Sequence, residues 1–146
     1  MHKTRFYPLK FLEEIKVQEP QAKVLPSGVK IFTINNGEGK QPKQTEFAMV
    51  NYAGYLRNGA LFDSNIKEVE ESYGKYQAMR EQQNGYQPIP FPYTPSAQLI
   101  PGFKEALLTM KVGDKIRVFI PAALGYGERG AGDVIPPNSD LIFDIE

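Results

Sequence analysis

The segment from Pro121 to Pro137 carries four glycines and three prolines, and this composition restricts what can follow the apolar residues before it. Glycines at positions 125, 127 and 130 spell G-x-G-x-x-G, which binds a dinucleotide only between a strand and a helix of a βαβ unit. Gly132 and the pair Pro136-Pro137 prevent a helix after this pattern, because both residue types disfavour a helix interior. Only 16 residues follow Gly130, too few for a helix and a second parallel strand. We therefore exclude a nucleotide site and expect the glycines to shape a loop.

The composition removes several classes of function. The chain has 146 residues, enough for one domain with a hydrophobic core, and its 17 basic and 17 acidic residues cancel, so no net field attracts nucleic acid. No apolar run is long enough to span a bilayer, and no signal-peptide core follows the first residues. Cys is absent and the one His, His2, stands at the terminus, so we expect no metal, no cofactor and no His or Cys catalysis. We expect a cytoplasmic location if the natural chain begins at Met1, and a periplasmic or cell-envelope location if the sequence is a trimmed mature form.

Apolar alternation and turn residues predict an antiparallel sheet. The pattern places strands at residues 29–34, 46–56, 61–63, 115–120 and 141–145. Asn58-Gly59 between two of these strands favours a hairpin, since both residues tolerate positive φ. Apolar residues at i, i+3, i+4 and i+7 predict a short helix over residues 103–110. These elements indicate an α+β domain in which about five strands form a curved antiparallel sheet around one short α-helix.

Two segments depart from this pattern. Residues 1–22 mix aromatic and charged side chains, and we interpret them as an N-terminal extension with a short helix over residues 9–17, resting on a domain of residues 23–146. Residues 66–87 are rich in charged residues and poor in β-branched ones, which predicts an inserted helical or irregular flap with a break at Gly74. The proline-rich residues 88–95 then return the chain in an extended form.

Four motifs follow one another along the chain. They are YAGYLRNGALFDS (52–64), QLIPGFKEALLTMKVGDK (98–115), IPAALGYGERG (120–130) and VIPPNSDLIFDIE (134–146). Together they resemble the successive signatures of FKBP-type peptidyl-prolyl cis–trans isomerases, and the resemblance runs from Val24 to Glu146. It implies the fold inferred above, with the active site between sheet and helix. It also implies rotamase activity in protein folding, and a chaperone role.

The resemblance assigns roles to individual positions. It makes four residues catalytic: Tyr52, Asp63, Ile100 and Tyr126. It makes six residues the substrate-binding lining: Phe62, Phe91, Leu99, Phe103, Ile135 and Phe143. Phe103 is then the floor beneath the proline ring, while the backbone N–H of Ile100 and the phenol of Tyr126 donate to substrate carbonyls. Tyr52 and Asp63 form a polar edge, and Tyr93 adds a further wall.

Two departures from the family pattern bear most on the site, and one ambiguity stays open. Phe103 stands where many members carry Trp, so we expect a smaller floor and weaker binding of macrolides such as tacrolimus and rapamycin. The insertion stands where the family commonly supplies an Arg to pair with the acid equivalent to Asp63, and Arg80 is the one Arg within it. Whether Arg80 takes that role is left open by the sequence. Taken singly, the apolar residues of the lining fit a core better than a ligand site, whereas the order of the motifs favours the site.

The implied chemistry needs no nucleophile. Rotation about a prolyl amide has a barrier of about 18–20 kcal/mol, and a ~10⁴-fold acceleration requires only about 5–6 kcal/mol of transition-state stabilisation. A water-poor aromatic basin can supply this by favouring the twisted amide in proline-containing peptides and unfolded proteins. The alternative is an FKBP-like module that binds proline segments with little catalysis and uses residues 66–87 to recognise a protein partner.

Overall fold

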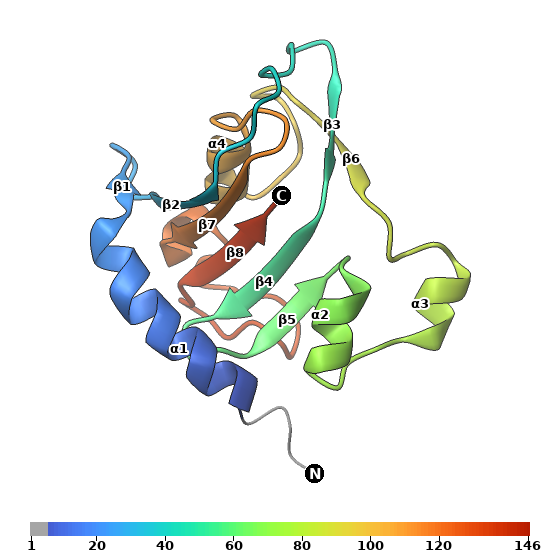
Figure 1. Ribbon diagram of the computed structural model, residues 1–146. Helices are drawn as coiled ribbons and strands as arrows, with labels where there is room; N and C mark the ends of the chain where they lie inside the picture. The colour runs from blue at the N-terminus through green and yellow to red at the C-terminus, as the bar shows by residue number, and fades with distance from the viewer. Residues whose placement is uncertain (1–5) are drawn as a thin grey trace.

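A computed structural model describes residues 6–146, so His2 lies outside the described residues. Its main element is a six-stranded antiparallel sheet in the order β1-β2-β7-β8-β4-β5 (Figure 1). The strands are β1 (Lys23–Val24), β2 (Lys30–Asn35), β7 (Lys115–Ile120), β8 (Leu141–Ile145), β4 (Tyr52–Leu56) and β5 (Leu61–Ser64). The predicted α+β class is confirmed, with more strands than the five expected.

Both faces of this sheet are covered, because alternate side chains of a strand point to opposite sides. On one face, α4 (Pro101–Leu107) packs against β7 and completes the larger core. On the other face, α1 (Phe6–Gln18) contributes Phe11 and Ile15 to a second core. The buried residues that it meets there are Ala53, Tyr55, Leu61, Phe119 and Ile142. Most of the predicted N-terminal extension is therefore docked on the sheet through apolar contacts.

A buried ion pair reinforces this docking. Arg117 donates from Nε and Nη2 to the two carboxylate oxygens of Asp144, at 2.6 and 2.8 Å. Its Nη1 donates to Glu14 and Gln18 of α1, at 3.2 and 2.9 Å. The guanidinium carbon also lies 4.8 Å from the ring centroid of Phe11. One cation thus links β7, β8 and α1, and η2 (Glu19–Gln21) follows the helix.

The predicted strand over residues 46–56 is wrong, because two strands occupy it. β3 (Phe47–Val50) pairs with β6 (Ile89–Pro92) in a separate two-stranded sheet. In this pair Pro90 lies opposite Met49, and Pro92 lies opposite Phe47. The chain then passes through Asn51 into β4 and the main sheet. The expected extended path of the proline-rich segment is β6 itself.

The amide of Asn65 explains the break between β3 and β4. Its Oδ1 accepts the N–H of Tyr52 at 2.7 Å, and its Nδ2 donates to the carbonyl of Val50 at 2.9 Å. Nδ2 also donates to the carbonyl of Gln87 at 3.0 Å. The side chain is buried, and all its hydrogen-bonding groups are used. It replaces strand pairing where the chain leaves one sheet for the other.

The remaining elements are short. The flap contains α2 (Lys67–Ser72), which lies beside β5, and α3 (Ala78–Gln82), which lies farther from the sheet (Figure 1). Gly74 between the two helices has a φ of 69°. The β4–β5 hairpin turns at Gly59, whose φ is 89°, as the Asn-Gly pair predicts. α4 begins two residues earlier than predicted, because Pro101 suits the first helical turn. Across residues 6–146, no helix has both the length and the apolar character that crossing a bilayer requires.

Candidate functional site

An open cavity of about 270 Å³ lies between α4, the sheet and β6. Its lining consists of Tyr52, Phe62, Asp63, Phe91, Gln98, Leu99, Ile100, Phe103, Tyr126 and Phe143. The structure thus brings together nine of the ten residues assigned by resemblance, although they come from six separate segments of the chain. Their predicted contacts with a substrate stay predictions.

The floor of the cavity is a set of rings that meet edge to face. Phe103 of α4 lies 5.1 Å from Phe143, 5.7 Å from Phe91 and 6.3 Å from Tyr52 between ring centroids. The interplanar angles are 86°, 90° and 88°, the arrangement that aromatic quadrupoles favour. Phe62 meets Phe143 in the same way at 5.5 Å. The rings therefore hold one another and leave an apolar surface open to a ligand.

A glycine makes this packing feasible. A Cβ atom added to Gly54 of β4 would lie 2.5 Å from the ring of Phe62 and 2.9 Å from the ring of Phe143. Both distances are far shorter than a carbon–carbon contact permits. The Y-A-G-Y sequence of β4 thus admits two rings over the strand, where any side chain at the third position would displace them.

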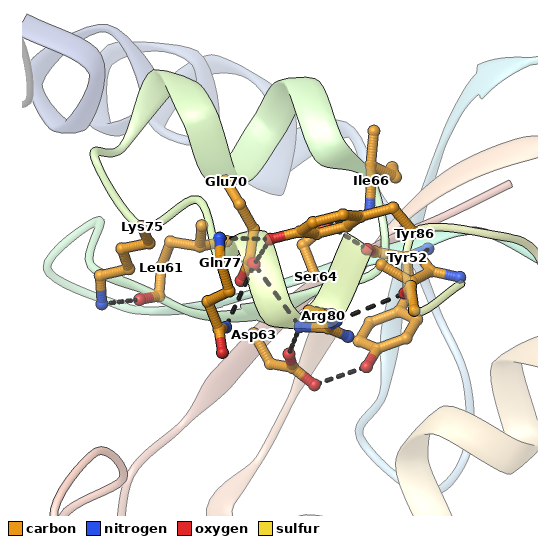
Figure 2. Close-up of polar contacts among 12 residues, drawn as sticks. Tyr52, Leu61, Asp63, Ser64, Ile66, Glu70, Lys75, Gln77, Arg80 and Tyr86 are labelled. Carbon is orange, nitrogen blue, oxygen red and sulfur yellow. Dashed lines mark hydrogen bonds and ion pairs between the residues drawn. The ribbon is translucent and has the colours of Figure 1, made fainter. Parts of the chain in front are cut away.

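One side of the cavity carries a polar edge. The Tyr52 hydroxyl donates to Asp63 Oδ2 at 2.5 Å, and Arg80 Nη1 donates to Asp63 Oδ1 at 3.0 Å (Figure 2). Burial, with a smaller effect from the Asp63 carboxylate, raises the pKa of Tyr52 far above its ordinary value, so the phenol stays a neutral donor. The role left open for Arg80 is therefore answered: the flap supplies the partner of Asp63.

Two residues of the lining carry a further donor that has no protein acceptor among residues 6–146. Ile100 stands at the N-cap of α4, and no described residue accepts its backbone N–H. The phenol of Tyr126 has no hydrogen-bond partner among residues 6–146, and this residue is 40 % exposed. The loop that carries Tyr126 bends through Gly127 and Gly130, with φ of 59° and 66°. The glycine pattern thus shapes a loop at the cavity rim, as expected from the prolines after it.

Two residues named from the sequence lie elsewhere. Ile135 is 3 % exposed and packs in the main core, outside the cavity lining, in a loop closed by a backbone bridge to Ala131. Tyr93 does not form the expected wall, since its buried hydroxyl donates to the carbonyl of Leu108 at 2.8 Å. It lines a different cavity.

Gln98 lines the cavity and was missed, because nothing in a polar loop residue distinguishes a lining position from a solvated one.

Within residues 6–146, no three His, Cys, Asp or Glu side chains lie together in a way that would hold a metal ion. The arrangement is therefore an apolar basin with one ion-paired edge and two unused donors. Such a site suits binding of a compact apolar ring flanked by carbonyl groups.

Comparison with known proteins identifies relatives of this chain. The model of the family "FKBP-type peptidyl-prolyl cis-trans isomerase" matches residues 38–146. The FKBP-type 22 kDa peptidyl-prolyl cis-trans isomerase of Escherichia coli (strain K12) is 38 % identical over 138 residues, which are 94 % of this chain and 57 % of that protein. FK506-binding protein 1 of Dictyostelium discoideum is 37 % identical over 120 residues, 82 % of this chain and 94 % of that protein.

Solved structures agree with these relatives. The crystal structure of a peptidyl-prolyl cis-trans isomerase from Pseudomonas syringae pv. tomato is 30 % identical, with a TM-score of 0.65 over 95 % of this chain and 90 % of that chain. The crystal structure of AtFKBP13 gives a TM-score of 0.67 at 29 % identity, covering 86 % of this chain and 94 % of that chain. The chain spans about half the length of several curated relatives that it matches.

Proposed function

The chain belongs to the FKBP-type peptidyl-prolyl cis–trans isomerase family, and we propose that it catalyses rotation about X-Pro bonds in peptides and unfolded proteins. The observation that carries this proposal is the cavity of about 270 Å³, whose floor of rings is not filled by the protein's own side chains. A proline ring is apolar and compact, and it is flanked by carbonyl groups that can accept hydrogen bonds. The unused donors at Ile100 and Tyr126 lie at this cavity.

The mechanism is non-covalent. A planar amide is more dipolar than a twisted one, so an apolar basin that excludes water disfavours the planar ground state more than the transition state. The N–H of Ile100 and the phenol of Tyr126 hold the flanking carbonyls while the C–N bond turns. An acceleration of ~10⁴ requires about 5–6 kcal/mol of preferential binding to the twisted form, which this combination can supply without a nucleophile.

An isomerisation assay on proline tetrapeptides tests the proposal. The protein at micromolar concentration is expected to raise the cis-to-trans rate clearly above the buffer rate, most strongly when the residue before proline is apolar. A Phe103→Ala variant, which removes the floor, serves as the inactive control. A wild-type rate equal to that of buffer would refute the proposed activity.

Macrolides are proposed as inhibitors of the same cavity. The name of the Dictyostelium relative states that it binds FK506. We expect tacrolimus and rapamycin to bind this cavity and to compete with proline peptides, but more weakly than at a tryptophan floor, because the phenylalanine floor is smaller. Calorimetric titration of each compound, repeated with saturating peptide, measures this. Simultaneous binding of macrolide and peptide would contradict a shared site.

A second candidate is a chaperone-like module in which the flap recognises an unfolded protein. It is favoured by two exposed side chains of the flap, Tyr76 and Met79. Neither residue lines the cavity, so a double variant with serine at both positions keeps every lining residue. If the double variant keeps tetrapeptide isomerisation but no longer suppresses aggregation of an unfolded client, the flap serves recognition. Equal suppression by both proteins would leave the flap without that role.

A further inference from the structure

Glu70 is a buried carboxylate that lies in the flap and outside the cavity lining. It is 3 % exposed, although α2 is a six-residue helix at the surface. Its Oε1 accepts the Tyr86 hydroxyl at 2.7 Å, and Gln77 Nε2 and Arg80 Nη1 both lie 3.5 Å from it. A buried charge is tolerated only when it is paired and hydrogen-bonded. The fold of the flap therefore requires a cation to stay beside Glu70.

That cation is Arg80, which stands between two carboxylates. Its Nη1 lies 3.0 Å from Asp63 Oδ1 and 3.5 Å from Glu70 Oε1, and its Nε donates to the Gly85 carbonyl at 3.3 Å (Figure 2). The guanidinium carbon also lies 5.3 Å from the ring centroid of Tyr86. A guanidinium group is rigid and planar, so contacts from several directions fix its orientation. Asp63 alone would not, because its side chain is 42 % exposed and surface ion pairs are weak.

We infer that Glu70 is a positioning residue for the cavity. It holds Arg80 against one oxygen of Asp63, whose other oxygen accepts the Tyr52 hydroxyl at 2.5 Å. Asp63 and Tyr52 line the cavity, whereas Glu70 does not. The flap thus fixes the polar edge of the site through a chain of ion pairs and hydrogen bonds from Glu70 to Tyr52. This inference rests on the proposed isomerase function, which requires the polar edge formed by Asp63 and Tyr52 to keep a fixed geometry.

Tyr86 is the second support of this chain. Its hydroxyl donates to Glu70, its ring lies against the guanidinium of Arg80, and its oxygen accepts the N–H of Gln77 at 3.0 Å. The tyrosine therefore fixes the carboxylate and the cation together. Removing its hydroxyl loosens Glu70 while the ring remains.

A double-mutant cycle tests the inference. Glu70→Gln, Tyr86→Phe and Asp63→Ala are prepared singly, and each of the first two is combined with the third. Glu81→Gln is the matched control, because Glu81 is a carboxylate of the same flap that pairs instead with Lys67 at 3.0 Å. All proteins are assayed for kcat and KM on a tetrapeptide substrate, with active-site concentration determined by peptide titration.

We expect Glu70→Gln to lower kcat by about tenfold, the size of a coupled charged contact, with KM little changed because the ring floor is intact. Tyr86→Phe is expected to lower kcat by a smaller factor. It replaces Glu70→Gln in the cycle if that variant does not fold. In the Asp63→Ala background both substitutions are silent, and Glu81→Gln matches wild type throughout. Losses that are equal in the two backgrounds would overturn the inference, since Glu70 would then act independently of Asp63. Wild-type kcat and KM for both single variants would overturn it as well.

The test also separates this inference from the proposed activity. If the wild-type protein does not accelerate isomerisation, the activity fails, and the same cycle is read in the free energy of unfolding by urea denaturation. Coupling between Glu70 and Asp63 in that free energy supports the positioning role. Its absence overturns the role independently of catalysis.

Discussion

Replacing Phe103 by leucine separates the role of this ring in the core from its role as a floor. Phe103 is 5 % exposed and makes three edge-to-face contacts, with Tyr52, Phe91 and Phe143. Each such contact contributes about 0.5–1.5 kcal/mol beyond the burial of apolar area. Leucine retains most of that area, so we expect a loss of about 2 kcal/mol in the free energy of unfolding. For a chain of this length the Tm then falls by about 4–8 °C.

The catalytic effect is expected to be separable from this structural one. Leucine offers no flat surface for the pyrrolidine ring and no longer orients Phe143 and Phe91, so kcat/KM is expected to fall at least about tenfold, or ~1.4 kcal/mol in the barrier. The assay is tetrapeptide isomerisation at a temperature where thermal denaturation shows both proteins fully folded. Any loss of activity is then due to the site and not to unfolded protein.

Phe119→Leu is the matched control. Phe119 is also 5 % exposed, but it belongs to the second core beneath α1, on the opposite face of the sheet. It is expected to lose stability by a comparable amount and to keep wild-type kcat/KM. If Phe103→Leu loses stability but keeps kcat/KM, the ring is a core residue only and the proposed mechanism loses its floor.

Three further predictions concern the rim and the framework. Tyr126→Phe is expected to lower kcat/KM about fivefold, the value of one neutral hydrogen bond of ~1 kcal/mol, with no change in Tm; a silent substitution in the tetrapeptide assay would remove the hydroxyl from the mechanism. Asp144→Asn leaves the buried Arg117 poorly paired and is expected to cost about 3 kcal/mol in urea denaturation; a loss well below that would contradict the structural importance of the pair. Burial acts against ionisation of Asp114, but the backbone N–H and ammonium of Lys111 outweigh it and lower the pKa of Asp114 below its ordinary 3.8. Its carboxylate therefore stabilises the fold above that pH and loses this contribution as the pH falls through the lowered value. Asp114→Asn should accordingly narrow the difference in Tm between neutral and acidic pH, and an unchanged difference would refute this.

The sequence predicted the bounds of two strands, the hairpin turn and most site residues, which depend on local patterns. β7 and β8 have the bounds that their alternation indicates, and the Asn58-Gly59 turn closes the hairpin as expected. The motif order also assigned nine of the ten predicted site residues to what is now a single cavity. These features depend on short-range pattern, or on signatures read in register.

What the sequence could not predict depends on contacts between distant segments. The break after β3 is made by Asn65, whose amide reaches back to Val50 and Tyr52. The pairing of Arg80 with Asp63 depends on two short helices that bring position 80 to the rim. Neither arrangement has a periodic signal, because a single side chain decides each one.

The prolines of β6 protect the open edge of this strand from pairing with other molecules. The N–H of Tyr93 donates to the carbonyl of Glu46 across the β3–β6 pair, so the odd-numbered residues of β6 direct their amides to β3. Pro90 and Pro92 therefore occupy the positions whose nitrogens point to the open margin, and those nitrogens carry no hydrogen. An approaching strand from another chain finds no donors there and cannot extend the ladder into an aggregate. The exposed apolar side chains of β3, Phe47 and Met49, thus lie beside a strand whose open edge does not favour self-association.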